Sequence, residues 1–211
     1  MRRLLAVVSS ALLAGCLTPL SASLKPTDRP LSLEAPADRA RLVFVRPARF
    51  TGSAVSAFFV DAASQRVLGK SVDQTMFAVD VEPGVHVVCP VPVFDQALAR
   101  MGPQTTPSLV TALPPTRLTV EAGRTYLLWV SVQWGPRVEA LPVRPDSPAE
   151  RDLRLAMVRA RPVELAPKLD DLVVDELPAW LDQCRRSFDA DVRLTAEPLD
   201  GRLTSGVPPS L

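Results

Sequence analysis

Residues 125–134, TYLLWVSVQW, decide the fold class because side chains of two kinds alternate along most of this stretch. In a β-strand successive side chains point to opposite faces of the sheet, so residues two apart share a face. The face that we expect to line the core carries Tyr126, Leu128, Val130 and Val132. The opposite face carries Thr125, Ser131 and Gln133. The stretch therefore predicts a strand with one buried face.

Short apolar runs separated by turn residues continue from residue 41 onward, which is typical of β-structure. The expected strands are residues 41–46, 54–61, 66–70, 75–81, 85–90, 117–121, 125–134 and 137–143. Glu82-Pro83-Gly84 and Glu121-Ala122-Gly123 are turn signals, since glycine adopts positive φ without steric cost. We therefore predict a mainly β protein, an antiparallel β-sandwich over residues 41–165 with one or two C-terminal helices.

The first helix is expected to begin at Ser147, which has the features of an N-cap. Pro148 then takes the first helical position, and Glu150 closes a capping box. A stripe at helical spacing follows: Leu153, Ala156, Met157 and Ala160. A second helix, in an extension over residues 166–190, is expected to begin near Asp175, with Pro178 in its first turn and a stripe of Leu177, Leu181, Cys184 and Phe188. Both stripes favour core packing over a binding groove, and residues 191–211 are expected to be disordered.

The N-terminus has the parts of a secretory signal. Arg2 and Arg3 precede an apolar run over residues 4–14, which is shorter than the approximately 20 residues that span a bilayer. The run ends in Leu13-Ala14-Gly15-Cys16, which resembles the lipobox of bacterial lipoproteins. That resemblance implies removal of residues 1–15, acylation of the Cys16 sulfur with fatty acids such as palmitate, and a membrane anchor. The alternative is an ordinary signal peptide in which Cys16 is a chance thiol.

The residue after Cys16, the segment that follows it and the charge balance of the chain add to the expectation of a lipid-anchored protein. Leu17 follows the cysteine, and by resemblance to Gram-negative lipoproteins this favours the outer membrane, facing the periplasm. Residues 17–40 contain four prolines and no sustained periodicity, so residues 16–40 are expected to form a lipidated tether. Loss of Arg2 and Arg3 from 24 basic residues, against 23 acidic ones, leaves a nearly neutral chain. This balance excludes the basic surface of a nucleic-acid-binding protein.

Cys89 and Cys184 remain after acylation of Cys16. In an oxidising envelope they form either a disulfide or two buried free thiols. Residues 91–116 contain many prolines and little periodicity, and so long a connection is either functional or disordered. If it is a recognition surface, Phe94, Met101 and Leu109 are the residues that we expect to contact another envelope protein.

Three pieces of the chain resemble the domain-of-unknown-function 2846 family of small bacterial lipoproteins. They are RLVFVRPARFTGSAVSAFFVD at 41–61, FAVDVEPGVHVV at 77–88 and LTVEAGRTYLLWVSV at 118–132. They cover under half of the chain. The resemblance implies a compact antiparallel β-sandwich and supplies no catalytic residues. The long connection after Pro90 and the C-terminal helices depart from the shorter form of the family.

Sequence motifs for chemistry are weak. His86 is the single histidine, and we interpret it as a structural residue near a turn, so a metal site is not expected. Gly69-Lys70-Ser71 lacks the first glycine of a phosphate-binding loop, since position 64 is Ser64. No G-x-S-x-G motif is present. We expect no cofactor and a noncatalytic envelope module; the alternative is a small-ligand carrier or envelope enzyme with a pocket between sandwich and helices.

Overall fold

The structure is a computed structural model. It describes residues 24–27, 29–48, 55–94, 115–133, 137–165 and 171–188. The strands are β1 (Leu24–Pro26), β2 (Ala40–Arg46), β3 (Val55–Asp61), β4 (Arg66–Ser71), β5 (Thr75–Val81), β6 (Gly84–Phe94), β7 (Thr116–Val120), β8 (Thr125–Gln133), β9 (Arg137–Pro142) and β10 (Arg161–Leu165). The helices are α3 (Pro148–Arg159) and α4 (Asp171–Phe188).

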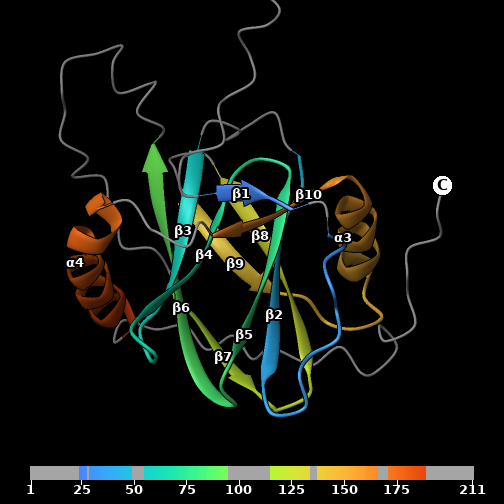
Figure 1. Cartoon of the computed structure of the whole chain (residues 1–211), viewed down its shortest axis with the longest axis horizontal. Coiled ribbons are helices and arrows are strands. Elements are labelled where there is room, and N and C mark those ends of the chain that lie inside the picture. Colours follow the sequence, from blue (N-terminus) through green and yellow to red (C-terminus); the bar gives the residue numbers. More distant parts are fainter. Residues whose placement is uncertain are drawn as a thin grey trace, which may run out of the picture.

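The strands form two sheets (Figure 1). The large sheet has the order β1-β10-β5-β2-β8-β9, and the small sheet has the order β4-β3-β6-β7. Neighbouring strands are antiparallel except for the parallel pairs β10 with β5 and β2 with β8. The predicted mainly β sandwich with two helices toward the C-terminus is confirmed.

The main core lies between the two sheets. As the alternation predicted, the buried residues of β8 include Tyr126, Leu128, Val130 and Val132. The expectation of a single buried face is wrong, because Thr125 and Leu127 on the opposite face are buried as well, Leu127 in the cluster beneath α3. Three phenylalanines join the sheets at the centre of this core: the ring centroid of Phe44 lies 4.6 Å from that of Phe77 and 4.8 Å from that of Phe59. Because Phe44 and Phe77 belong to the large sheet and Phe59 to the small one, their contact fixes the two layers against each other.

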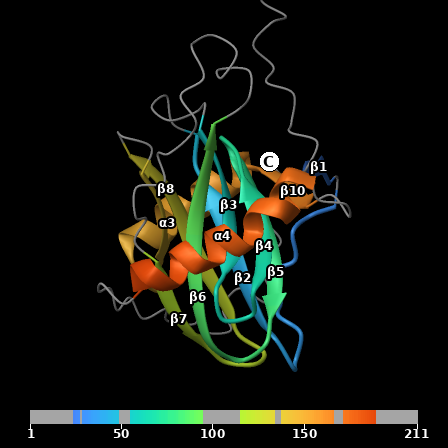
Figure 2. The same ribbon diagram turned by 90° about the vertical axis from the view of Figure 1, so that its left-hand side faces the viewer.

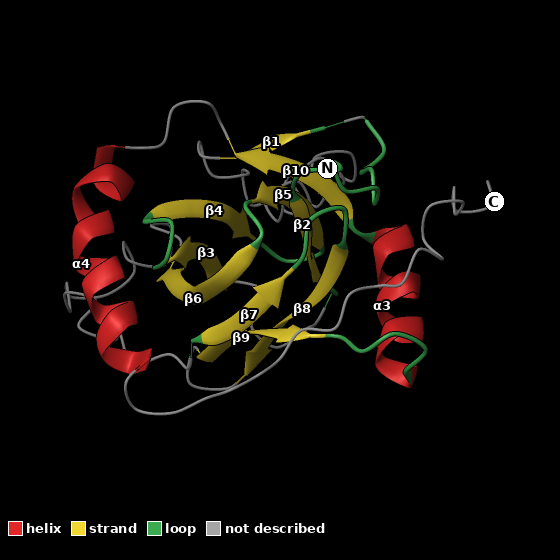
Figure 3. Cartoon of the chain, turned by 90° about the horizontal axis from the view of Figure 1, so that it is seen from below, coloured by secondary structure: helices red, strands yellow, loops and turns green. Residues whose placement is uncertain are grey.

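Each sheet carries one helix on its outer face (Figure 3). Leu153 of α3 packs with Val43 and Val45 of the large sheet. Leu181 of α4 packs with Phe58 and other residues of the small sheet, and Figure 2 shows α4 crossing this face. The described molecule therefore has four layers, helix, sheet, sheet, helix, and the expected packing role of both helical stripes is confirmed where their side chains are described.

The start of α3 has the predicted N-cap and proline, but the capping box is not closed by Glu150 as predicted. The Ser147 hydroxyl oxygen accepts a hydrogen bond from the Glu150 backbone N–H at 3.1 Å, and Pro148 is the first helical residue. The Glu150 carboxylate accepts from the Asp146 backbone N–H at 2.5 Å. The Glu150 carboxylate thus binds the N–H of Asp146, one residue before the N-cap, rather than the N–H of Ser147 itself. α3 ends at Arg159, and the chain enters β10 after Ala160 alone.

The prediction of a free tether over residues 16–40 is wrong for the part that the structure describes. Leu24–Pro26 pairs with β10, and Leu31 and Leu33 pack against the cluster beneath α3. The Thr125 hydroxyl donates to the Leu33 carbonyl oxygen at 2.6 Å, so hydrogen bonds as well as apolar contacts hold this segment. Residues 1–23 lie outside the described residues.

Two other expectations need correction. β1 and β10 are not among the expected strands, because both are short and each contains a proline, which is rare inside strands. α4 begins at Asp171 rather than near Asp175, so Pro178 lies inside the helix instead of in its first turn. Pro178 has no N–H, and it therefore removes one hydrogen bond from the helical ladder. The tail over residues 191–211 lies outside the described residues.

Candidate functional site

The predicted site residues fall into two groups. Cys16, Met101 and Leu109 lie outside the described residues, and Phe94 is the last residue of β6. Cys89 and Cys184 are both described and buried. The candidate interaction loop therefore has no described geometry, whereas the cysteine pair does.

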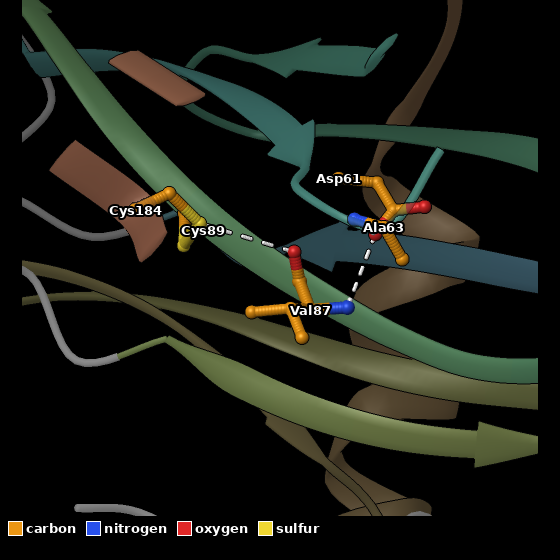
Figure 4. Close-up of a disulfide and its surroundings, with 5 residues drawn as sticks. All are labelled: Asp61, Ala63, Val87, Cys89 and Cys184. Atoms are coloured by element: carbon orange, nitrogen blue, oxygen red, sulfur yellow. Dashed lines mark hydrogen bonds between the residues drawn. A yellow bond between two sulfur atoms is a disulfide. The ribbon is translucent and has the colours of Figure 1, made fainter. Parts of the chain in front are cut away.

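A disulfide joins Cys89 of β6 to Cys184 of α4 (Figure 4). Their Cα atoms are 5.8 Å apart, within the range that disulfide geometry requires. Leu181 and Phe58 pack in the same cluster, and the Phe58 ring lies 5.7 Å from that of Trp180. Of the two alternatives that the sequence left open, the structure contains the bonded one, which attaches α4 to the small sheet.

A buried polar cluster lies at the end of β3, and sequence reasoning did not find it. Asp61 is the last residue of β3 and is completely buried. His86 lies near the start of the neighbouring strand β6, where it is 6% exposed. The Asp61 carboxylate and the His86 Nδ1 atom are 2.8 Å apart. The antiparallel register, with Asp61 opposite Val88, brings these two residues together across the strand pair.

The Asp61 carboxylate organises the turn between β3 and β4. It accepts hydrogen bonds from the backbone N–H groups of Ala63 at 3.1 Å and Ser64 at 3.2 Å. The Ser64 hydroxyl donates to the same carboxylate at 2.5 Å. On the side of β6, the Val87 N–H donates to it at 3.0 Å. Asp61 therefore joins a turn to the adjacent strand, as a short acceptor side chain does in Asx-type turns.

Both ring nitrogens of His86 face hydrogen-bond acceptors. Nδ1 faces the Asp61 carboxylate, and Nε2 lies 2.7 Å from the Glu82 carbonyl oxygen. A neutral imidazole carries one N–H, whereas two acceptors require two donors. The arrangement therefore favours the protonated ring, which forms a buried ion pair with Asp61.

The electrostatics of the pair follow from this arrangement. Burial opposes the charge on Asp61, but hydrogen bonds from His86 and Ser64, the positive imidazolium and the Val87 N–H lower the Asp61 pKa to about 2. Burial also opposes the charge on His86, as does nearby Arg66. The hydrogen bonds to Asp61 and the Glu82 carbonyl, together with the Asp61 charge, prevail and raise the His86 pKa.

Val87 connects the polar cluster to the disulfide (Figure 4). Its N–H donates to Asp61, and its carbonyl oxygen accepts from the Ala62 N–H at 2.9 Å. The bonded sulfur of Cys184, which carries no proton, lies 3.9 Å from the same carbonyl oxygen. One residue of β6 thus contacts Asp61, the β3–β4 turn and the disulfide that attaches α4.

The cluster is arranged for structure rather than for proton transfer. The Ser64 hydroxyl donates to Asp61 and not to His86, and the second nitrogen of His86 is held by a backbone carbonyl. This differs from a nucleophile hydrogen-bonded to a general base. Within the described ranges, no three His, Cys, Asp or Glu side chains gather as metal ligands would. One sequence signal for the cluster was present: an aspartate that ends a strand, followed three residues later by serine.

No protein family, curated protein or solved structure shows a significant match to this chain. Among the described residues, no helix has the length and the apolar character needed to cross a bilayer.

Proposed function

We propose that this protein is a noncatalytic lipoprotein of the cell envelope, anchored through Cys16, whose β-sandwich serves as a structural or protein-interaction module. The observation that carries the proposal is the Cys89–Cys184 disulfide. Membership of the lipoprotein family that the sequence resembles is part of the same proposal.

The disulfide supports export from the cytoplasm. Disulfides persist in oxidising compartments such as the periplasm and are rare in the reducing cytoplasm. Both cysteines are buried, and their bond holds a helix on a sheet, which is a structural use rather than the exposed setting of a redox-reactive cysteine. An exported chain agrees with the signal-like N-terminus and with a cysteine at position 16.

The interior supports a structural module over a carrier or an enzyme. A carrier with a pocket between sandwich and helices needs open space there. Between the large sheet and α3 lies an apolar cluster around Leu153, and between the small sheet and α4 lies another around Leu181. The Asp61–His86 pair hydrogen-bonds mainly to backbone groups. Each of these features contributes to holding the fold.

Metabolic labelling with palmitate tests the anchor. The parent protein is expected to incorporate label and to fractionate with membranes, whereas Cys16→Ser loses the label and is released in soluble form. Val85→Ser is the control, because it changes one exposed side chain of β6 and leaves both Cys16 and the disulfide in place. Absence of label in the parent, with Cys16→Ser fractionating like the parent, rejects the proposal.

Crosslinking in the native envelope, followed by mass spectrometry, tests the interaction role. Partner peptides are expected to crosslink to the region of Phe94, Met101 and Leu109. Replacement of residues 95–114 by a glycine-serine linker of equal length is expected to abolish them while the disulfide is retained. Unchanged crosslinks after this replacement place the partner elsewhere, and a defined enzymatic activity of the purified protein contradicts the noncatalytic proposal.

A further inference from the structure

The outer face of α3 carries two exposed apolar side chains. Leu155 is 69% exposed and Val158 is 56% exposed. They are three residues apart and therefore adjacent on the helix surface. Leu153, on the opposite side of the helix, is fully buried against the large sheet. α3 thus has one apolar side that packs in the fold and a second that faces away from it.

Arginines surround these two side chains. Arg151 lies one turn before Leu155, Arg154 and Arg159 flank the same face, and all three are exposed. The segment 144–161 contains five arginines and three acidic residues. One of the acidic residues, Glu150, is buried and paired with Arg154 at 2.7 Å, and Asp152 lies at the edge of the face. The face is therefore apolar at its centre and predominantly basic around it.

This composition matches a lipid headgroup surface better than a protein partner. Helices that lie in a membrane interface insert apolar side chains at the headgroup boundary, and their basic residues meet anionic headgroups. A stable protein dimer needs a far larger contact area, with a core depleted of charge. Two apolar side chains among arginines do not provide such a core.

The path of the chain places this face within reach of the proposed anchor. Cys16 precedes Leu24 by eight residues, and a fully extended chain of that length spans about 28 Å. Leu24 pairs with Leu165 at the far end of β10. β10 has five residues, which span about 16 Å, and it begins one residue after α3 ends. Figure 1 shows β1 and β10 at the top of the molecule, between α4 on one side and α3 on the other.

We propose that the outer face of α3, centred on Leu155 and Val158, docks on an anionic phospholipid leaflet. This inference rests on the proposed anchor, because a lipidated Cys16 keeps the helix near the membrane. Docking supplies a second contact that fixes the orientation of the sandwich, with α3 toward the lipid and α4 on the far side. The lipid chemistry recognised is a phosphate-bearing anionic headgroup, which guanidinium groups bind strongly.

Vesicle flotation tests the docking separately from lipidation. The oxidised mature chain with Cys16→Ser is mixed with phosphatidylcholine vesicles that contain or lack phosphatidylglycerol. Binding is expected only with phosphatidylglycerol and is expected to fall as salt is added. Arg151→Gln is expected to weaken binding about fivefold, from the contribution of one basic residue near an anionic surface. The double variant Leu155→Ser/Val158→Ser is expected to lose binding.

Two controls match these variants. Arg185→Gln removes an exposed arginine from α4, and Val85→Ser removes an apolar side chain that is 43% exposed on β6. Both are expected to bind like the parent, and circular dichroism checks that each variant is folded. The inference is overturned by equal binding to both vesicles, by equal losses in the controls, or by self-association in solution that the double variant abolishes.

Vesicle flotation and palmitate labelling test the docking and the anchor separately, so the failure of one can be told from the failure of the other. Palmitate on Cys16 without vesicle binding leaves the anchor in place and removes the docking. Vesicle binding without palmitate on Cys16 removes the anchor and leaves a peripheral lipid-binding face.

Discussion

Asp61→Asn is expected to destabilise the protein by a pH-dependent amount. Asp61 is completely buried and pairs with His86. Removal of one partner from a buried ion pair costs about 3 to 5 kcal/mol. The asparagine amide also places N–H donors opposite the donors of Ser64 and Val87, which the carboxylate accepts in the parent. We therefore expect a loss of this size in the free energy of unfolding near pH 6.

The pH dependence follows from the Asp61 pKa. That pKa is about 2 in the folded protein and 3.8 for an unperturbed aspartate. A lowered pKa gives stability that is present above the unfolded value and lost as pH falls through the folded one. The difference corresponds to about 2 to 3 kcal/mol. The parent is therefore expected to lose about this amount as pH falls from roughly 5 to 2. Asp61→Asn lacks this contribution, because it has no carboxylate at position 61.

Urea unfolding followed by tryptophan fluorescence measures the effect, since Trp180 of α4 packs on Phe58 of the small sheet. The gap in free energy between the parent and Asp61→Asn is expected to narrow by about 2 to 3 kcal/mol on acidification. Asp152→Asn, at an exposed carboxylate of α3, is the control and is expected to change stability by less than about 0.5 kcal/mol at any pH. A gap that stays constant from neutral to acidic pH refutes the argument from the carboxylate charge.

The dependence of the unfolding free energy on pH above neutrality tests whether folding stabilises the charged form of His86. Its raised pKa gives stability that is fully present below the unfolded value of 6.5 and lost as pH rises through the folded value. The parent is therefore expected to weaken above neutral pH. His86→Gln is expected to be less stable at acidic pH and to have a flatter profile above pH 6.5. A parent profile that is level on the alkaline side shows that the imidazolium is not stabilised by folding.

Changes at three places, Gly69, the disulfide and Ser147, test packing and local structure by denaturant unfolding. Gly69→Ala is expected to cost about 1 to 3 kcal/mol, because the added Cβ atom meets the buried Phe77 ring; Phe77→Leu in the same chain is expected to recover part of the loss. Replacing Cys89 and Cys184 by alanine removes a crosslink between residues 95 apart, and up to about 4 to 5 kcal/mol is expected to be lost. Reducing agent is expected to destabilise the parent and leave that double variant unchanged. Ser147→Ala removes the α3 cap and is expected to cost about 1 kcal/mol, which Ser147→Asp largely avoids.

The strands were predictable where a local pattern determines burial. The expected strand at 75–81 has the bounds of β5, and most others differ from the observed strands by one or two residues. β2 and β3 are buried on both faces, so a continuous apolar run marks them, whereas alternation and turn residues mark strands such as β5. β1 and β10 are short and gain their hydrogen bonds only by pairing with each other and with β5. The sequence of residues 24–40 therefore predicts a tether, although the part that the structure describes packs on the sandwich.

The polar cluster was harder to predict because it depends on register. Alternation assigns His86 to a face of its strand, but it does not say which residue of another strand lies nearby. Asp61 and His86 are 25 residues apart, and their contact requires the pairing of β3 with β6. The turn that Asp61 organises involves only neighbouring residues, so it could be predicted from the local sequence. The ion pair depends on tertiary structure.

The two apolar sides of α3 show where a periodic pattern stops being informative. Helical spacing identified Leu153, Ala156 and Met157 as a packing stripe, and these residues pack on the large sheet. Leu155 and Val158 are also apolar, but a sheet covers only one side of a helix, so they remain exposed. The sheet covers the first stripe, so helical spacing alone does not say what the second contacts. The basic residues around it, and the short reach of chain from Cys16 to β1, make a lipid surface the partner to test first.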